Sequence, residues 1–254
     1  AVALALDGAL GLSYEALLSI CSQRLVAETK ATMGRHRSAE AAAGYVRRFL
    51  GGQTLCSISK DVGLPPTMLA RVVLEEHLGL RKGVKGKAGV GALLKNPSAL
   101  EDPRLRREVQ AAVAADVVYG PAVDVSRRMA GLEYEMVLQQ ELRARRIPFL
   151  SENEMRVRAE AKTPDALLPV PLLVRGRQVH WIDSKATFGD PASHAEYVTS
   201  QFASYVNRYA SGLVIYWFGF DASIDTDADL VLSDGFPHAD CELMSRCALR
   251  HVVA

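Results

Sequence analysis

Two charged residues stand two positions apart in an otherwise apolar stretch, VHWIDSKA, which runs from Val179 to Ala186. The side chains of a β-strand alternate between its two faces, so Asp183 and Lys185 are expected on one face, roughly 7 Å apart. A carboxylate next to an ammonium can bind a divalent metal ion and stabilise a phosphate. The alternative is an exposed salt bridge, because an acid-x-Lys triplet also occurs by chance in a chain of this length.

A second carboxylate is expected at the same end of the sheet. The segment from Thr163 to Val174 is also extended, and Gly176 marks a hairpin turn between it and the strand with the charged pair. Counting back across this turn places Asp165 opposite about residue 187, and Pro164 keeps the backbone before it extended. Two carboxylates and one ammonium are therefore predicted to converge.

Oxygen ligands in such an arrangement suit a hard cation, Mg²⁺ or Mn²⁺. The expected ligands are Asp165, Asp183 and the backbone carbonyl of Ser184. Lys185 would then lower the pKa of a metal-bound water or stabilise the pentavalent phosphate. This set of residues predicts a site for phosphodiester hydrolysis.

The helix expected from about Val125 to Arg146 offers one further acid, either Glu133 or Glu135. Two residues in these positions lie about 200° apart around a helix, so only one of them can face the end of the sheet. We favour Glu135, because it lies nearer the edge of the expected apolar stripe, and we expect Glu133 to be solvated. The residues of that stripe are Met129, Leu132, Met136 and Leu142.

Polar side chains also recur along the helix expected from Pro191 to Tyr209, which Asp190 would cap. Their separations of seven, four and three residues predict one polar stripe that binds substrate phosphate or orients the metal-bound water. The alternative is a hydrated outer face, with the tyrosine half buried. The four residues are His194, Gln201, Tyr205 and Arg208.

The first half of the chain carries a helix-turn-helix pattern from Ser57 to Gly79. Ile58 would face inward from a first helix, Gly63 would take the turn, and Pro66 would open a second helix. Such a pair predicts a DNA-binding element, although helical hairpins without that role share the pattern.

Basic residues accompany this pattern. The second helix carries one, and the segment from Arg81 to Gly89 places four more among glycines, as in a flexible basic loop. They are the expected contacts to nucleic-acid phosphates, against the alternative of a solvated loop. These residues are Arg71, Arg81, Lys82, Lys85 and Lys87.

Composition bounds these interpretations. The chain has 254 residues, 49% of them hydrophobic, which is enough for one large or two small domains. Residues 1–120 contain more basic than acidic residues and residues 121–254 the reverse, which fits a polyanion-binding half and a carboxylate-built half. The longest apolar run, Gly212 to Phe220, is shorter than the roughly 18 residues of a membrane span, and the four cysteines form no CxxC pair. We therefore expect a soluble intracellular protein.

Two domains follow from the order of the expected elements. Residues 1–120 are expected to be all-helical with the helix-turn-helix pattern, and residues 121–254 to form an α/β domain. Its expected order is helix, three strands, helix and strand, in which helices cover one sheet.

These motifs together resemble a known superfamily. The PD-(D/E)xK nucleases resemble this chain in the order of their elements and in three motifs, which here are Thr163-Pro164-Asp165, Ile182-Asp183-Ser184-Lys185 and an upstream glutamate. The segment Gln201-Phe-Ala-Ser-Tyr205 is similar to the Gln-x-x-x-Tyr motif of the RecB-like members of that superfamily. The segments KTPD, HWIDSKATFGD, QFASYVNRY and GLVIYWFGF resemble more narrowly the codanin-interacting nuclease family.

The resemblance implies a helix-turn-helix region followed by a restriction-endonuclease-like αβββαβ core, a Mg²⁺ site, residence in nucleus and cytoplasm, and a complex with codanin. It implies metal binding by Glu135, Asp165 and Asp183, a catalytic Lys185, and an auxiliary pair formed by Gln201 and Tyr205. Two alternative functions therefore follow from the sequence. The first is a metal-dependent nuclease, and the second is a catalytically idle nuclease fold that binds DNA or a protein.

Overall fold

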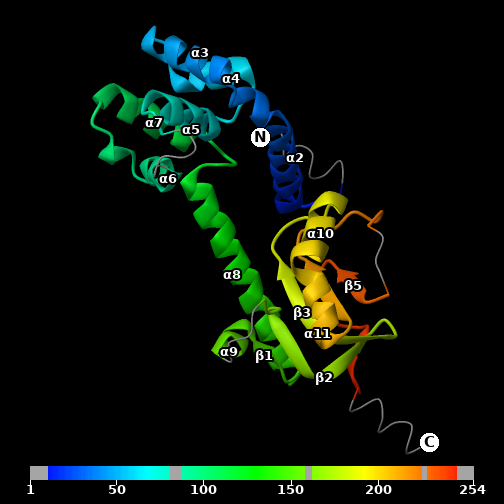
Figure 1. Ribbon diagram of the computed structural model, residues 1–254. Helices are drawn as coiled ribbons and strands as arrows, with labels where there is room; N and C mark the ends of the chain where they lie inside the picture. Colours follow the sequence, from blue (N-terminus) through cyan, green and yellow to red (C-terminus); the bar gives the residue numbers. More distant parts are fainter. Residues whose placement is uncertain (1–10, 81–86, 158–161, 225–227, 245–254) are drawn as a thin grey trace, which may run out of the picture. The chain divides into compact units, whose positions relative to one another are not determined.

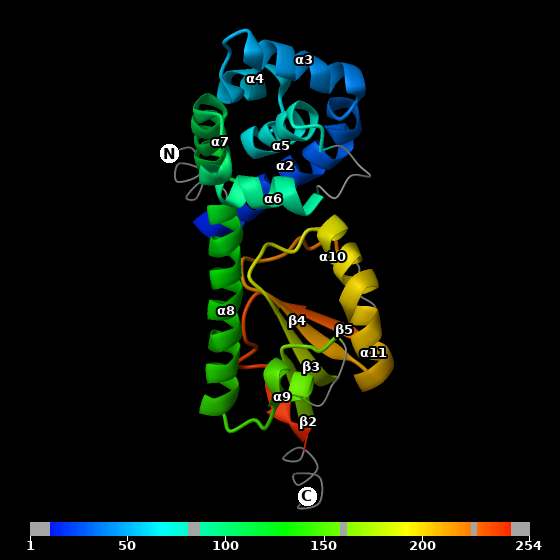
Figure 2. The ribbon, with the colours of Figure 1, turned by 60° about the vertical axis from the view of Figure 1, so that its left-hand side comes forward.

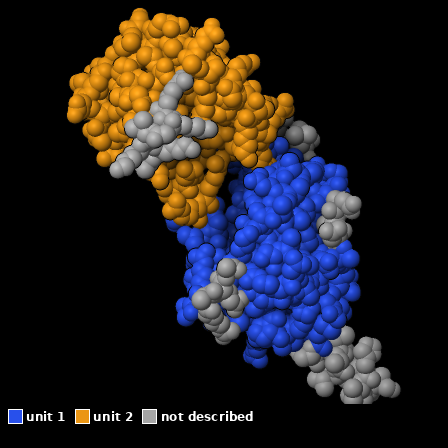
Figure 3. Space-filling view, in the orientation of Figure 1, with its two compact units in different colours: residues 1–20, 129–254 blue, residues 21–128 orange. Residues whose placement is uncertain are grey.

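The computed structural model describes residues 11–80, 87–157, 162–224 and 228–244 (Figure 1). The chain divides into two compact units, residues 21–128 and residues 1–20 with 129–254 (Figure 3). The borders fall within two long helices, α2 (Tyr14–His36) and α8 (Pro121–Ala144), whereas the sequence-based division at residue 120 falls where α8 begins. Among the helices of the described ranges, none is long and apolar enough to cross a membrane.

The unit of residues 21–128 is helical and is built around one apolar core. Phe49, Leu55 and Leu69 are among its fully buried side chains. Besides most of α2, its elements are α3 (Ala39–Leu50), α4 (Leu55–Val62), α5 (Pro66–His77), α6 (Lys87–Lys95), the 3₁₀ turn η1 (Pro97–Ala99) and α7 (Pro103–Ala115). Side-chain oxygens of the residues just before α3, α4 and α7 accept hydrogen bonds from first-turn amides, which satisfies donors that the helices themselves cannot.

Helices α4 and α5 lie where the helix-turn-helix pattern predicts two helices. Gly63 ends α4 in the left-handed conformation, with φ 67°, and Pro66 opens α5. The buried carboxylate of Asp116 accepts a 2.9 Å hydrogen bond from the Thr67 amide and so fixes the start of α5. The role of this helix pair in DNA binding stays a prediction.

The second unit is built on a mixed sheet, as expected for an α/β domain. Its strand order is β1-β2-β3-β4-β5, and β6 also pairs with β2. The pairs β3–β4 and β4–β5 are parallel, and the pairs that involve β2 are antiparallel. The strands are β1 (Leu150–Ser151), β2 (Ala166–Val174), β3 (Arg177–Lys185), β4 (Gly212–Tyr216), β5 (Leu230–Ser233) and β6 (Cys241–Leu243). The expected order of helix, three strands, helix and strand is present, with the short helix α9 (Glu152–Val157) and the strands β5 and β6 in addition.

Helices cover both faces of this sheet (Figure 2). Leu138 and Leu142 of α8 pack with Ile182 on one face. On the other face, Phe202 of the crossover from β3 to β4 packs on Trp181 of β3 in an aromatic cluster. That crossover consists of α10 (Pro191–Tyr197), the π-helical turn η2 (Val198–Phe202) and α11 (Ala203–Tyr209).

The apolar stripe predicted for α8 is wrong. Met129, Leu132 and Met136 are 60%, 49% and 60% exposed, whereas Leu138 and Leu142 are fully buried. Leu142 follows Met136 by six residues, which turns it about 120° away around the helix, so the predicted stripe combined two different faces.

The β2–β3 hairpin turns at Gly176, as predicted, but its register differs. Leu172 pairs with Val179 near the turn, whereas Ala166 pairs with Ile182, and the register shifts between these two pairs. Strand β2 contains two prolines, at positions 169 and 171, which cannot donate ladder hydrogen bonds and are typical of bulges. Because of this shift, the residue before Ala166 lies beside the end of β3 at Asp183 and Ser184, and the predicted position opposite residue 187 is wrong.

The parallel pairing of β3 with β4 depends on a glycine. A Cβ atom at Gly212 would overlap the ring of Trp181, which is fully buried. We expect Gly212→Ala to destabilise the protein by about 2–3 kcal/mol, through overpacking. Denaturant unfolding measures this, with Gly131→Ala on α8 as the control, because a Cβ there meets nothing within 4 Å. The control should be neutral or slightly stabilising, and equal stability of the two variants would contradict the packing argument.

Candidate active site

Strands β2 and β3 bring Asp165 to the charged pair. The Asp165 carboxylate accepts a 2.6 Å hydrogen bond from the backbone amide of Ser184, which lies between Asp183 and Lys185. The hydroxyl of Ser184 accepts a hydrogen bond from Trp217, 2.7 Å away. The structure thus joins the predicted carboxylates through the Ser184 backbone, and the Ser184 carbonyl as a metal ligand stays a prediction.

Helix α8 adds Glu135 to this group. Leu138 and Leu142 follow Glu135 by three and seven residues, so the helical period places all three on the face that packs on the sheet. Glu133 lies on the exposed part of the helix. The prediction of Glu135 therefore holds for its position, although the stripe used to choose it was wrong.

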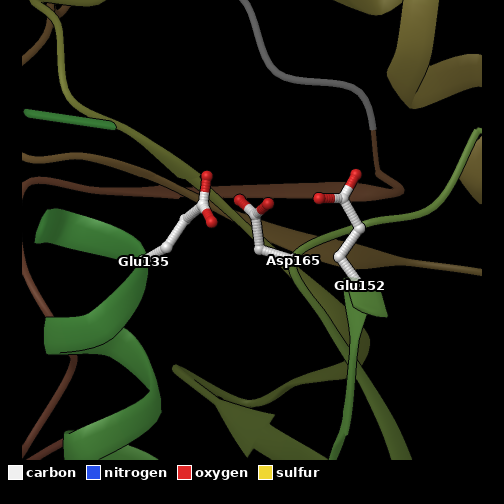
Figure 4. Close-up of side chains that lie close together, drawn as sticks. All are labelled: Glu135, Glu152 and Asp165. Carbon is white, nitrogen blue, oxygen red and sulfur yellow. The ribbon is translucent and has the colours of Figure 1, made fainter. Parts of the chain in front are cut away.

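Glu152 belongs to the same cluster and was missed. One carboxylate oxygen from each of Glu135, Glu152 and Asp165 lies within 4.8 Å of the other two. Figure 4 shows these side chains coming from α8, from α9 and from the chain just before β2. Ser151 pairs with Ala166 at the start of β2, which places the following residue beside Asp165.

A local signal for Glu152 was present in the sequence. The motif Ser-Glu-Asn-Glu at residues 151–154 is a capping box, and such a box predicts the start of a helix. In the structure the Ser151 amide donates to the Glu154 carboxylate at 2.8 Å, and the Glu154 amide donates weakly to the Ser151 hydroxyl at 3.4 Å. Recognising the box would have placed Glu152 at the first position of α9.

Lys185 is held tightly at the edge of the acidic group. Its Nζ lies 2.5 Å from an oxygen of Asp183 and 2.9 Å from Oε1 of Gln201. The ammonium also lies over the rings of Tyr197 and Phe202, 4.9 and 5.5 Å from their centres. Asp183 itself is only 2% exposed, so this ion pair is a buried one and not the exposed salt bridge that was the alternative.

The other three residues of the predicted polar stripe have different surroundings. Tyr205 is buried and donates a 2.9 Å hydrogen bond to the carbonyl of Thr163, two residues before Asp165. Arg208 is exposed and donates to the carbonyl of Lys162. His194 is buried among aromatic rings, 2.9 Å from the Tyr216 hydroxyl. The prediction of one continuous stripe is wrong for His194, because the π-helical turn changes the helical phase between it and the other residues.

Three of the five predicted basic residues fall outside the residues that the structure describes. Arg71 is on α5 and is partly exposed. Arg81, Lys82 and Lys85 lie outside the described residues. Lys87 is the first residue of α6, so the predicted basic loop gives way to a helix before it reaches Gly89.

Burial and mutual repulsion perturb the acidic group. Burial raises the pKa of the Asp165 carboxyl well above its ordinary value, and the charge of Asp183 raises it further, against the amide hydrogen bond of Ser184. Burial also raises the pKa of Asp183, and Lys185 opposes this shift. For Glu135, burial and then the charge of Glu152 raise the pKa.

Lys185 responds in the opposite sense. Burial acts to lower its pKa, but the carboxylates of Asp183 and Asp165 outweigh burial and hold the pKa above its ordinary value. Lys185 therefore stays protonated at neutral pH. Two cations, Lys185 and Arg156, lie beside the four carboxyl groups, and the remaining surplus of negative charge on oxygen ligands fits a hard divalent cation.

Comparison with known proteins places the chain among its relatives. A family model described as "Protein of unknown function TPD sequence-motif" matches residues 101–236, which include Thr163-Pro164-Asp165. The "CDAN1-interacting nuclease 1" of Danio rerio is 40% identical over 242 residues, which cover 91% of this chain and 80% of that protein. The proteins of the same name from Mus musculus and Homo sapiens are 37% and 36% identical, over 89% of this chain and 84% of each relative.

The chain therefore belongs to the family of CDAN1-interacting nuclease 1 proteins, which confirms the narrower of the two resemblances, that to the codanin-interacting nuclease family. No solved structure matches the chain.

The perturbed carboxyl group predicts a pH dependence of stability. Because the native-state pKa of Asp165 lies above its ordinary 3.8, ionisation destabilises the folded protein as the pH rises through that raised pKa. Without added metal, Asp165→Asn should melt about 2–4 °C higher than the wild type at about pH 8, the shift that ~1 kcal/mol gives in a protein of this size. The difference in melting temperature should shrink toward about pH 4, where the Asp165 carboxyl of the folded wild type is protonated and neither protein carries a charge at this position.

Thermal melting across this pH range, in a chelating buffer, tests the prediction. Glu133→Gln is the control, since it removes an exposed carboxylate from α8 and should leave the melting temperature unchanged. An Asp165→Asn variant that is less stable than the wild type at high pH would contradict the prediction. It would show that the surroundings of Asp165 stabilise its ionised carboxylate.

Proposed function

We propose that this protein is a metal-dependent nuclease that hydrolyses phosphodiester bonds of nucleic acid, on a PD-(D/E)xK fold. The observation that carries the proposal is the cluster of Glu135, Glu152 and Asp165, with the ion pair of Asp183 and Lys185 attached through Ser184. The sheet order and the crossover helix between β3 and β4 agree with the αβββαβ core. The word nuclease in the relatives' name supports the same activity.

The proposed ligands of Mg²⁺ or Mn²⁺ are Glu135, Glu152, Asp165 and Asp183. When bound, the cation would neutralise these carboxylates and polarise a phosphoryl oxygen. Oxygens of Glu135, Glu152 and Asp165 lie within 4.8 Å of one another, and Asp183 adjoins them through Ser184. A hard cation prefers such carboxylate oxygens, and the surplus of negative charge favours its binding.

Lys185 keeps one of the two roles that the sequence offered. Its ammonium lies at the edge of the acidic cluster, 2.5 Å from an oxygen of Asp183. There it places positive charge against the negative charge that develops on the phosphate. Gln201 and Asp183 orient the ammonium for this purpose, and Tyr205 positions the chain that carries Asp165.

The partners proposed are nucleic acid and codanin. The relatives' name states an interaction with CDAN1, and the identity over most of the chain supports the same partnership here. For nucleic acid, the α4–α5 pair with Arg71 partly exposed on α5 supports a contact outside the active site.

A cleavage assay tests the reaction. Labelled single-stranded, duplex, flap and RNA substrates are incubated with the wild type and with Asp183→Asn, in Mg²⁺ or Mn²⁺. We expect the variant to lose roughly 10²–10³-fold in rate, because it loses one anionic ligand of the cation and the carboxylate that orients Lys185, and both support the groups that stabilise transition-state charge. A control, Glu133→Gln, should cut at the wild-type rate. An Asp183→Asn protein that cuts as fast as the wild type would refute the assignment, and a wild type that binds Mn²⁺ but cuts nothing would favour the idle binding module.

Metal binding tests the role of Glu152 independently of cleavage. Titration calorimetry with Mn²⁺ should show about tenfold weaker binding to Glu152→Gln, because one anionic ligand is lost while the shape is kept. Glu133→Gln again serves as the control. Unchanged affinity in Glu152→Gln would show that Glu152 is not a ligand, and the proposed ligands would then be Glu135, Asp165 and Asp183.

A further inference from the structure

A polar cavity of about 300 Å³ adjoins the acidic cluster. It shares Glu152 with that cluster, and it shares Gln201 with the hydrogen bond to Lys185. Its lining comes from α9, from the chain before β2, from η2 and from α11. The lining residues are Glu152, Arg156, Lys162, Thr163, Ser200, Gln201 and Tyr205.

The charge of this cavity is opposite to that of the cluster beside it. Arg156 is paired with Glu152 at 2.7 Å, so these two charges compensate each other. Lys162 donates a 3.0 Å hydrogen bond to the carbonyl of Ser200, a neutral acceptor. Among the described residues Lys162 pairs with no carboxylate, so the lining carries a formal charge of about +1 and its ammonium is available to an anion.

The backbone around the cavity is fixed in an uncommon conformation. Lys162 has a φ of 53°, a backbone conformation that residues other than glycine rarely adopt. Arg208 donates to the carbonyl of Lys162, and Tyr205 donates to the carbonyl of the next residue, Thr163. These bonds hold Lys162 and Asp165 in a fixed relation, with the intervening residues Thr163 and Pro164 buried.

The opposite wall is also irregular. Ser200 and Gln201 lie in the π-helical turn η2, a rare form that is frequent at functional sites. In this turn the Ser200 carbonyl accepts from Lys162, while the Gln201 side chain accepts from Lys185. One turn of helix therefore touches both the cationic cavity and the ammonium of the active site.

We propose that this cavity binds a phosphate group of the nucleic-acid strand next to the one that is hydrolysed. The proposal rests on the proposed nuclease function and names a subsite for its substrate. Lys162 makes the charged contact, the paired Arg156 offers its remaining N–H donors, and the hydroxyl of Ser200 or Thr163 adds a neutral one. A phosphate fits better than a base, since the lining is polar and its one aromatic ring, that of Tyr205, already packs against Trp181.

Two kinds of phosphate share this chemistry, a terminal monophosphate and an internal phosphodiester. Binding of a short labelled strand is measured by fluorescence anisotropy in Ca²⁺ in place of Mg²⁺, for strands with a terminal phosphate, with a terminal hydroxyl, and with one neutral methylphosphonate at successive positions. The wild type should lose about tenfold in affinity when the phosphate that occupies the cavity is removed, the value of one charge-assisted contact.

The variant Lys162→Gln should bind the phosphate-bearing strand about tenfold more weakly and should bind the strand without that phosphate as the wild type does. Lys162→Arg should restore the preference, and Arg143→Gln, which removes an exposed cation from α8, should leave it unchanged. Dependence on the terminal group identifies an end-binding subsite, and dependence on one internal position identifies an internal one.

Equal loss of affinity for every strand, or no loss, in Lys162→Gln would overturn the proposal, as would a wild type that binds no strand. A wild type that shows the Lys162-dependent preference but cuts no substrate would support the phosphate subsite while refuting the nuclease function. If the wild type cuts, and Lys162→Gln changes neither its rate nor its affinity, the result would support the nuclease function and refute the phosphate subsite.

Discussion

The concentration of like charge where β2 begins and β3 ends is the constraint on which the rest of the site depends. Carboxyl groups repel one another, and each loses hydration on burial, so their convergence is costly unless other groups offset it. The backbone amide of Ser184 offsets part of this cost at Asp165, and the ammonium of Lys185 does so at Asp183. Part of the repulsion between the carboxylates is not offset, and acids with shifted pKa values are common at active sites.

Rigid surroundings keep these groups together. On one face of the sheet, Leu138 and Leu142 anchor α8 and so fix the direction of Glu135. On the other face, Phe202 and Tyr205 pack on Trp181, so η2 cannot shift without disturbing the aromatic cluster. The acids are therefore carried by elements that bury large apolar side chains on the sheet, and this packing supplies the stability that the charges themselves remove.

Local patterns predicted which side chains meet better than they predicted how the strands and helices bring them together. The strand alternation placed Asp183 and Lys185 on one face, and the hairpin turn at Gly176 brought Asp165 to the same end. The register could not be counted from the turn, because a bulge in a strand with two prolines depends on the contacts of both faces. Helical period alone did not identify the buried face of α8, since apolar residues occupy several of its faces. Glu152 and the burial of His194 follow from strand pairing and from a π-helical turn, and neither leaves a strong periodic signal.

The parallel pairing of β3 with β4 has a consequence for how the site comes into being during folding. Glu135 and Gln201 are far apart in the chain, and β4 can join β3 only after the crossover of α10, η2 and α11 has closed. Contacts of such long sequence separation form late, because loop-closure entropy opposes them. The unfolded or partly synthesised chain thus lacks the complete site, because Gln201 of the crossover reaches Lys185 only in the native fold. A ligand that required the complete site would stabilise only the native state.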